Sequence, residues 1–158
     1  MTPIQSDPRK TRLAVLRVLV VDDNPHDRAL ITEVLSSVEL EDVKRFEVRE
    51  ASTAAEARQI AMDEEIDVIL IDQGLPDAKG TDLVRDLKRD GVTCAMLGVS
   101  GLDDRGLARR FIVAGARDFI TKDKFSDVRI ATTLRNVAWK TRFDRYLIGA
   151  FESDGKTL

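Results

Sequence analysis

Five short runs of mainly apolar and β-branched residues recur along the chain, separated by longer stretches of mixed polarity. Two of them, Val18–Val21 and Val68–Ile71, are continuously apolar, which is typical of central parallel strands buried on both faces. The other three are less pure, which favours positions nearer the sheet edges. The pattern predicts strands at Arg17–Val21, Phe46–Glu50, Asp67–Ile71, Ala95–Val99 and Asp118–Ile120.

Amphipathic stretches alternate with these strands. Thr53 and Glu56 fit a helix capping box, and Gly91 and Gly115 stand where helix C-caps belong. Regular alternation of strands and helices implies right-handed crossovers, and hence an α/β fold with a doubly wound parallel sheet and helices on both faces. Helices are predicted at about Asp27–Val38, Ala54–Asp63, Thr81–Asp90, Arg105–Ala114 and from Asp127 onward.

Composition narrows the classes of function. The 158 residues carry a net charge of −3, which argues against a broad basic surface for nucleic acid. The single cysteine, Cys94, excludes an internal disulfide and a thiolate metal cluster, and fits a reducing compartment. No apolar stretch approaches the ~20 residues of a membrane span. We therefore expect a soluble, cytoplasmic protein that contacts neither nucleic acid nor membrane.

Polar residues gather just after the predicted strand ends. Asp22 and Asp23 follow the first strand, Asp72 the third, Ser100 the fourth, and Lys122 comes shortly after the fifth. In a doubly wound sheet the carboxyl ends of the strands share one edge, and ligands bind there. We therefore expect three carboxylates, a hydroxyl and an ammonium to converge from distant parts of the sequence.

The chemistry of this set points to a phosphoryl group and a hard metal ion. Three neighbouring carboxylates repel one another unless a cation or protons neutralise them, and oxygen ligands without His or Cys favour Mg²⁺. Lys122 offers a positive charge to a phosphoryl oxygen, and Ser100 offers a hydrogen-bond donor. A carboxylate beside Mg²⁺ can also act as a nucleophile and give an acyl phosphate.

Four segments in this order resemble the receiver domains of two-component response regulators, over about Leu16 to Ala138. They are Val20–Asn24, Ile69–Gly80, Gly98–Gly101 and Gly115–Lys122. The resemblance implies a flavodoxin-like (βα)5 fold, with a five-stranded parallel sheet in the order 2-1-3-4-5. It also implies a sensor histidine kinase or a phosphotransfer protein as the partner.

The resemblance assigns roles to particular residues. Asp72 is implied as the phosphoacceptor. Asp22 and Asp23, together with Asp72 and the backbone carbonyl of Gly74, are implied as the ligands of Mg²⁺.

Three further residues complete the site implied by the resemblance. Ser100 would bond the incoming phosphoryl group and Lys122 would pair with it. Phe119 would be the aromatic switch whose rotamer follows the Ser100 hydroxyl.

The chain departs from the family pattern in three places. Asp123 follows the lysine where the family usually has proline, so we expect a differently shaped loop there. The stretch Ser37–Arg45 is a few residues longer than usual, and Gln73 is polar where the family tends to be apolar.

The C-terminal segment predicts one long helix, because Asp127–Ile148 contains neither Gly nor Pro. Ile130, Leu134 and Val137 form one helical stripe that should pack on the sheet. A second stripe lies on the opposite face, and aromatic residues near arginines are typical of interface cores. Its residues are a candidate dimer interface, with packing against Val15 and Leu16 of the same chain as the alternative: Trp139, Phe143, Tyr146 and Leu147.

These observations predict a flexible lead-in over 1–15, a receiver domain over 16–138 and a helical extension and tail over 139–158. The expected function is that of a single-domain response regulator, not an enzyme, which signals by protein contact. The alternative is an interaction or dimerisation module, or a phosphorelay intermediate, whose output depends on the C-terminal helix rather than on phosphorylation.

Overall fold

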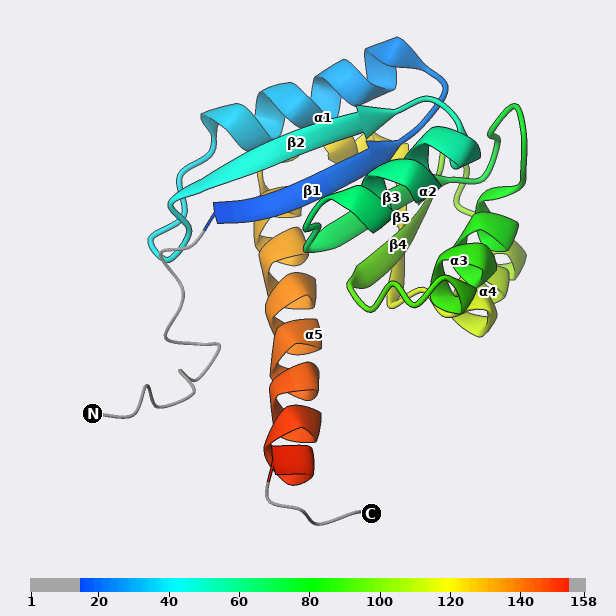
Figure 1. Cartoon of the computed structure of the whole chain (residues 1–158). Coiled ribbons are helices and arrows are strands. Elements are labelled where there is room, and N and C mark those ends of the chain that lie inside the picture. The colour runs from blue at the N-terminus through cyan, green and yellow to red at the C-terminus, as the bar shows by residue number, and fades with distance from the viewer. Residues whose placement is uncertain (1–14, 154–158) are drawn as a thin grey trace.

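The computed structural model describes residues 15–153 and confirms the predicted alternation of strands and helices (Figure 1). The strands are β1 (Val15–Val21), β2 (Arg45–Ala51), β3 (Val68–Asp72), β4 (Ala95–Ser100) and β5 (Asp118–Thr121). The helices are α1 (Pro25–Ser37), α2 (Ala54–Asp63), α3 (Gly80–Arg89), α4 (Arg105–Ala114) and α5 (Arg129–Ser153), with a short 3₁₀ helix, η2 (Lys122–Ser126), before α5.

All five strands form one parallel sheet in the order β2-β1-β3-β4-β5, as expected. The register pairs Val21 with Ile71, and Ile71 with Gly98. The carboxyl ends of the central strands are therefore level, so the residues that follow them emerge along the same edge.

Each face of the sheet carries its own core. In β1, Val18 and Val20 pack with α1 and α5, whereas Leu19 and Val21 pack with α2, α3 and α4. This alternation follows from the two-residue period of a strand. Every residue of β3 is buried, as a strand covered on both faces requires.

Most elements begin or end within two residues of their predicted bounds, and two of these differences bear on the limits of the domain. Val15 belongs to β1 and pairs with Arg45, so it is not part of the lead-in. The last helix begins at Arg129 rather than Asp127, because η2 comes first and the Asp127 carboxylate accepts the Arg129 N–H at 2.9 Å. This helix then runs through Gly149 to Ser153. The rest of the predicted lead-in and the tail beyond Ser153 lie outside the described residues.

The first half of α5 packs on the domain. Ile130 and Leu134 are buried and Val137 is partly buried, which confirms the predicted inner stripe. Trp139 also packs within the chain, in a cluster with Leu16 and Val43, and the Arg135 guanidinium lies over its ring at 5.1 Å. For Trp139, intramolecular packing is therefore what the structure shows.

Three ion pairs bind α5 to loops at the starts of strands. They join Arg135 to Asp42 at 3.0 Å, Asp144 to Arg117 at 3.0 Å, and Arg142 to Asp67. Among and just after these residues, Phe143 and Tyr146 are stacked with ring centroids 6.4 Å apart, and Leu147 is 41% exposed. This end of α5 extends past the sheet (Figure 1).

Among residues 15–153, no helix combines the length and the apolar character needed to cross a membrane.

Candidate functional site

The edge formed by the carboxyl ends of the strands carries the polar residues that the sequence singled out. Asp22 follows β1, Asp72 ends β3, Ser100 ends β4 and Lys122 follows β5. One carboxylate oxygen from each of Asp22, Asp23 and Asp72 lies within 4.8 Å of the others. The expected convergence of three carboxylates and a lysine is present.

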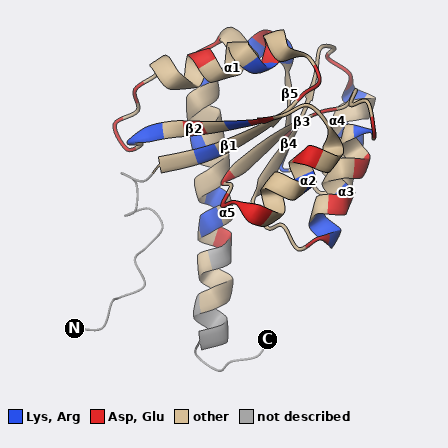
Figure 2. Cartoon of the chain, turned by 45° about the horizontal axis from the view of Figure 1, so that its top comes forward, with Lys and Arg blue, Asp and Glu red and all other residues tan. Residues whose placement is uncertain are grey.

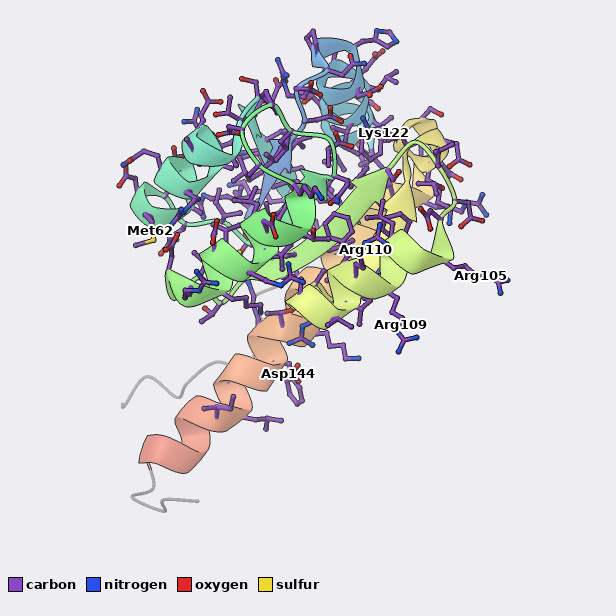
Figure 3. All side chains as sticks on the ribbon, turned by 90° about the vertical axis from the view of Figure 1, so that its right-hand side faces the viewer. Met62, Arg105, Arg109, Arg110, Lys122 and Asp144 are labelled. Carbon is purple, nitrogen blue, oxygen red and sulfur yellow. The ribbon has the colours of Figure 1, made fainter. Side chains whose placement is uncertain are left out.

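The Lys122 ammonium contacts two of these carboxylates and one more, that of Asp27. Its Nζ atom lies 2.8 Å from Asp22 Oδ2, 2.8 Å from Asp27 Oδ2 and 3.3 Å from Asp72 Oδ1. Lys122 follows the carboxyl end of β5 (Figure 3). One lysine thus pairs with carboxylates that lie 50 to 100 positions before it in the sequence.

Asp22 is held in place by its backbone and by one carboxylate oxygen. Its N–H donates to the Ala51 carbonyl at 3.0 Å, its Oδ1 accepts the Asn24 N–H at 2.9 Å, and its carbonyl accepts Arg28 Nη1 at 2.7 Å. Its buried Oδ2 is at ion-pair distance from Lys122 but accepts no hydrogen bond of acceptable geometry. A buried carboxylate oxygen left in this state calls for a further cation.

The site therefore fits a hard divalent ion. Asp22, Asp23 and Asp72 supply carboxylate oxygens only, which is the donor set of Mg²⁺. Asp23 is exposed, so a metal ion bound here could keep water ligands on that side. The predicted contribution of the Gly74 carbonyl stays a prediction, while the Gly74 N–H donates to Asp72 Oδ2 at 3.2 Å.

Burial and charge shift the ionisation of two groups. Burial raises the pKa of the Asp72 carboxyl, and the Asp22 charge raises it further, against the opposing effects of Lys122 and the Gly74 N–H. Partial burial favours neutral Lys122, but its close contacts with the carboxylates of Asp22 and Asp27 and the charge of Asp72 outweigh burial and raise the lysine pKa. Lys122 therefore stays charged at neutral pH.

The loop after β3 is fixed tightly around Asp72. The Gly80 N–H donates to the Gln73 carbonyl at 3.0 Å, and the Gln73 side chain accepts the Thr81 N–H at 3.0 Å. A Cβ atom on Gly80 would lie 2.9 Å from the Asp72 carbonyl carbon and closer still to its oxygen. Gln73 thus caps α3, and Gly80 allows α3 to begin against the Asp72 backbone.

Ser100 and Phe119 lie at the same edge with partners of their own. Ser100 Oγ accepts the Leu102 N–H at 3.1 Å. The Phe119 ring is partly buried and lies 5.8 Å from the Phe111 ring. Lys122 opens η2, and residues 15–153 contain no cis peptide bond, so the segment after the lysine takes the shape of a 3₁₀ turn.

Sequence reasoning missed Asp27. This residue occupies the first turn of α1, where acidic residues are common because they favour the helix N-terminus. Its contact with Lys122 joins residues 95 positions apart. The signal that could have found it is its place on α1 just after Asp22 and Asp23, at the same edge of the sheet.

Fold and site together define a class of protein, the doubly wound α/β proteins with a carboxylate cluster and one lysine at the carboxyl edge of the sheet. The sequence profile of the family described as "Response regulator receiver domain" matches residues 18–135. The chain belongs to this family.

Individual proteins are also similar to this chain in sequence. The phosphate regulon transcriptional regulatory protein PhoB of Pseudomonas aeruginosa is 32% identical over 128 residues, which cover 78% of this chain and 52% of PhoB. A cyclic di-GMP phosphodiesterase of Thermotoga maritima is 28% identical over 135 residues, covering 84% of this chain and 34% of that protein. The chain thus spans about half or less of these relatives.

Solved structures share the fold. A CheY-like response regulator receiver domain protein from Methanospirillum hungatei superposes with a TM-score of 0.70 at 22% identity, over 82% of this chain and 98% of that one. NtrX from Brucella abortus gives a TM-score of 0.74 at 24% identity, over 86% of this chain and 29% of that one.

Proposed function

We propose that this chain accepts a phosphoryl group on Asp72, in a Mg²⁺-dependent reaction, from a sensor histidine kinase or a phosphotransfer protein. It then signals in the cytoplasm by protein contact, as the receiver of a response regulator. The main support for this proposal is the position of the Lys122 ammonium. It lies 3.3 Å from Oδ1 of Asp72, which belongs to a cluster of three carboxylates.

The chemistry follows from these positions. An Asp72 oxygen attacks the phosphorus of a phosphohistidine, so that a P–O bond forms while the P–N bond breaks and the imidazole leaves. Mg²⁺ held by Asp22, Asp23 and Asp72 would neutralise charge at the site when bound. Lys122, already beside Asp72, pairs with a phosphoryl oxygen. The chain takes part in its own phosphorylation and does not turn over a separate substrate.

The same edge supplies a route for the signal. A phosphoryl dianion on Asp72 attracts the Ser100 hydroxyl, which at present accepts the Leu102 N–H. Movement of Ser100 frees space at the edge, and the Phe119 ring, already beside Phe111, turns further inward. The phosphoryl group thereby shifts an existing equilibrium in the surface around α4 and β5.

The charge on α4 supports output by protein contact. Both signs of charge occur on α1 and α3 (Figure 2), but α4 carries Arg105, Arg109 and Arg110 and no acidic residue. Arg105 and Arg109 project away from the domain (Figure 3). Exposed Val113 lies on the same helix, and arginine beside apolar surface is typical of protein interfaces.

These three arginines stand apart from the others. Every other arginine whose side chain the structure describes lies within ion-pair distance of a carboxylate. Within the described residues, the α4 arginines have no such partner of their own chain. This leaves their charge available to another protein.

One feature favours the alternative function, a module whose switch is self-association. The last part of α5 extends past the sheet (Figure 1). Phe143 and Tyr146 stack on this helix, and Leu147 and Ile148 are 41% and 57% exposed. A second copy of the chain could bury this end of α5.

The test is the intact mass of the chain after incubation with Mg²⁺ and a small phosphodonor. We expect the unaltered chain to gain one phosphoryl group, and Asp72→Asn or added EDTA to prevent the gain. Sedimentation with and without the donor distinguishes the two functions. Self-association that does not change on phosphorylation, in a chain that gains no phosphoryl group from its kinase, would favour the alternative.

A further inference from the structure

Asp27 is a third carboxylate on the Lys122 ammonium, and it differs from the other two. Asp22 and Asp72 belong to the group of three that can hold a metal ion, whereas Asp27 does not. Yet Asp27 Oδ2 is as close to Lys122 Nζ as Asp22 Oδ2 is, at 2.8 Å, and it accepts a hydrogen bond of good geometry.

The position of Asp27 is fixed by the start of α1. Asn24 is the N-cap, and its Oδ1 accepts the N–H groups of His26 and Asp27 at 2.9 and 3.3 Å. The side chains of Asp27 and Lys122 are only 19% and 20% exposed. A partly desolvated pair of this kind is screened less by water and salt than a surface ion pair.

A metal ion and Lys122 compete for the same oxygens. Asp22 Oδ2 and Asp72 Oδ1 both contact the ammonium, and a divalent cation bound by these carboxylates would take them over. Like charges repel, so the ammonium must give way as the cation enters. Asp27 is the partner that can still hold Lys122 at that moment.

We propose that Asp27 is a positioning residue that draws the Lys122 ammonium to the side of the carboxylate cluster. It thereby leaves Asp22 and Asp72 available to Mg²⁺ and keeps Lys122 beside the place where a phosphoryl group arrives. Because a lysine side chain loses rotamer entropy when it is fixed, a permanent anchor also lowers the entropic cost of each new contact. This inference rests on the proposed metal site.

The test measures Mg²⁺ binding to the full chain by calorimetry, with no phosphodonor present. Asp27→Asn removes the negative charge and keeps the shape, and Asp27→Ala serves as a second variant. Asp123→Asn is the matched control, because it removes the same charge from the exposed residue next to Lys122. Each variant is made in the unaltered chain and in a Lys122→Met background, and thermal unfolding confirms that each is folded.

In the unaltered background, we expect Asp27→Asn to raise the Mg²⁺ dissociation constant about fivefold more than Asp123→Asn does, as for residues in direct contact. In the Lys122→Met background the two variants should differ by less than about twofold, because Asp27 acts through the lysine. In the spectrum of the metal-free chain, Asp27→Asn should also shift the ¹⁵N resonance of Lys122 Nζ, which Asp123→Asn should leave in place.

Equal effects of Asp27→Asn in both backgrounds would show that Asp27 acts on the metal directly, and would overturn this inference while leaving the proposed function intact. An effect no larger than that of Asp123→Asn would also overturn it. Absence of Mg²⁺ binding by the unaltered chain would overturn the metal site and this inference together.

Discussion

Asp77 binds the first turn of α2 from the loop after β3: its Oδ1 atom accepts the Ala54 N–H at 2.8 Å. Its Oδ2 atom accepts the next N–H, that of Ala55, at 3.0 Å. One carboxylate thus satisfies two unpaired donors at a helix start and connects α2 to the loop that carries Asp72. Replacing Asp77 by Asn should lower the thermal unfolding midpoint by a few degrees at neutral pH.

The pH dependence of this effect follows from the Asp77 pKa. The N–H groups of Ala54 and Ala55 hold the pKa of Asp77 below its usual range. A lowered pKa in the folded state gives stability that is present above the unfolded pKa, about 3.9, and is lost as the pH falls through the folded value. Urea unfolding at pH 7 and pH 3 should therefore show the Asp77→Asn penalty shrinking with acid. A constant penalty would exclude this linkage.

Gly80 should tolerate no side chain. A Cβ atom there would press on the Asp72 carbonyl group, and neither backbone can move without shifting the site. We expect Gly80→Ala to cost about 1–3 kcal/mol of stability, the range for overpacking, and to slow phosphorylation of Asp72. Gly149→Ala is the matched control, because nothing lies within 4 Å of its added Cβ and alanine favours a helix. Equal stability of the two variants would contradict the close approach.

The point at which α5 is cut should decide whether the domain stays stable. Truncation after Ala138 removes Trp139 and the Arg142–Asp67 ion pair, so it should cost about 2 kcal/mol or more in chemical denaturation. Truncation after Asp144 keeps these contacts and should leave the stability nearly unchanged. Both shortened chains should gain a phosphoryl group at Asp72. Equal denaturation midpoints would show that α5 contributes nothing beyond Ala138.

A truncation at the same end of α5 tests whether the chain self-associates there. Truncation after Asp144 removes Tyr146 and Leu147 but keeps the described ion pairs of α5. If a second copy binds there, this truncation should convert any dimer to monomer in sedimentation experiments. A dimer that survives the truncation would place the interface elsewhere.

Most of the fold could be predicted from the pattern of apolar residues, because a strand that is buried on both faces has a continuous apolar sequence. The continuous apolar runs of β1 and β3 fixed the central strands, and the common edge of a parallel sheet then brought Asp22, Asp72 and Lys122 together. These are consequences of topology, so residue order was sufficient to infer them.

Contacts between side chains of distant loops could not be inferred in this way. The Asp77 cap on α2 and the Gln73 cap on α3 depend on where two loops pass each other. The Asp27–Lys122 pair depends on how α1 is rotated over the sheet edge. Neither periodicity nor composition reports these relative positions, and the same holds for Trp139, whose packing depends on the loop before β2.

The ion pairs of α5 have a spatial consequence. Asp42, Asp67 and Arg117 all come shortly before strands, so they mark the edge of the sheet opposite to Asp72. The far end of α5 leaves the domain from that opposite edge. A kinase bound at Asp72 and a target protein bound to the end of α5 would therefore not obstruct each other. The chain could then hold its phosphodonor and its target at the same time.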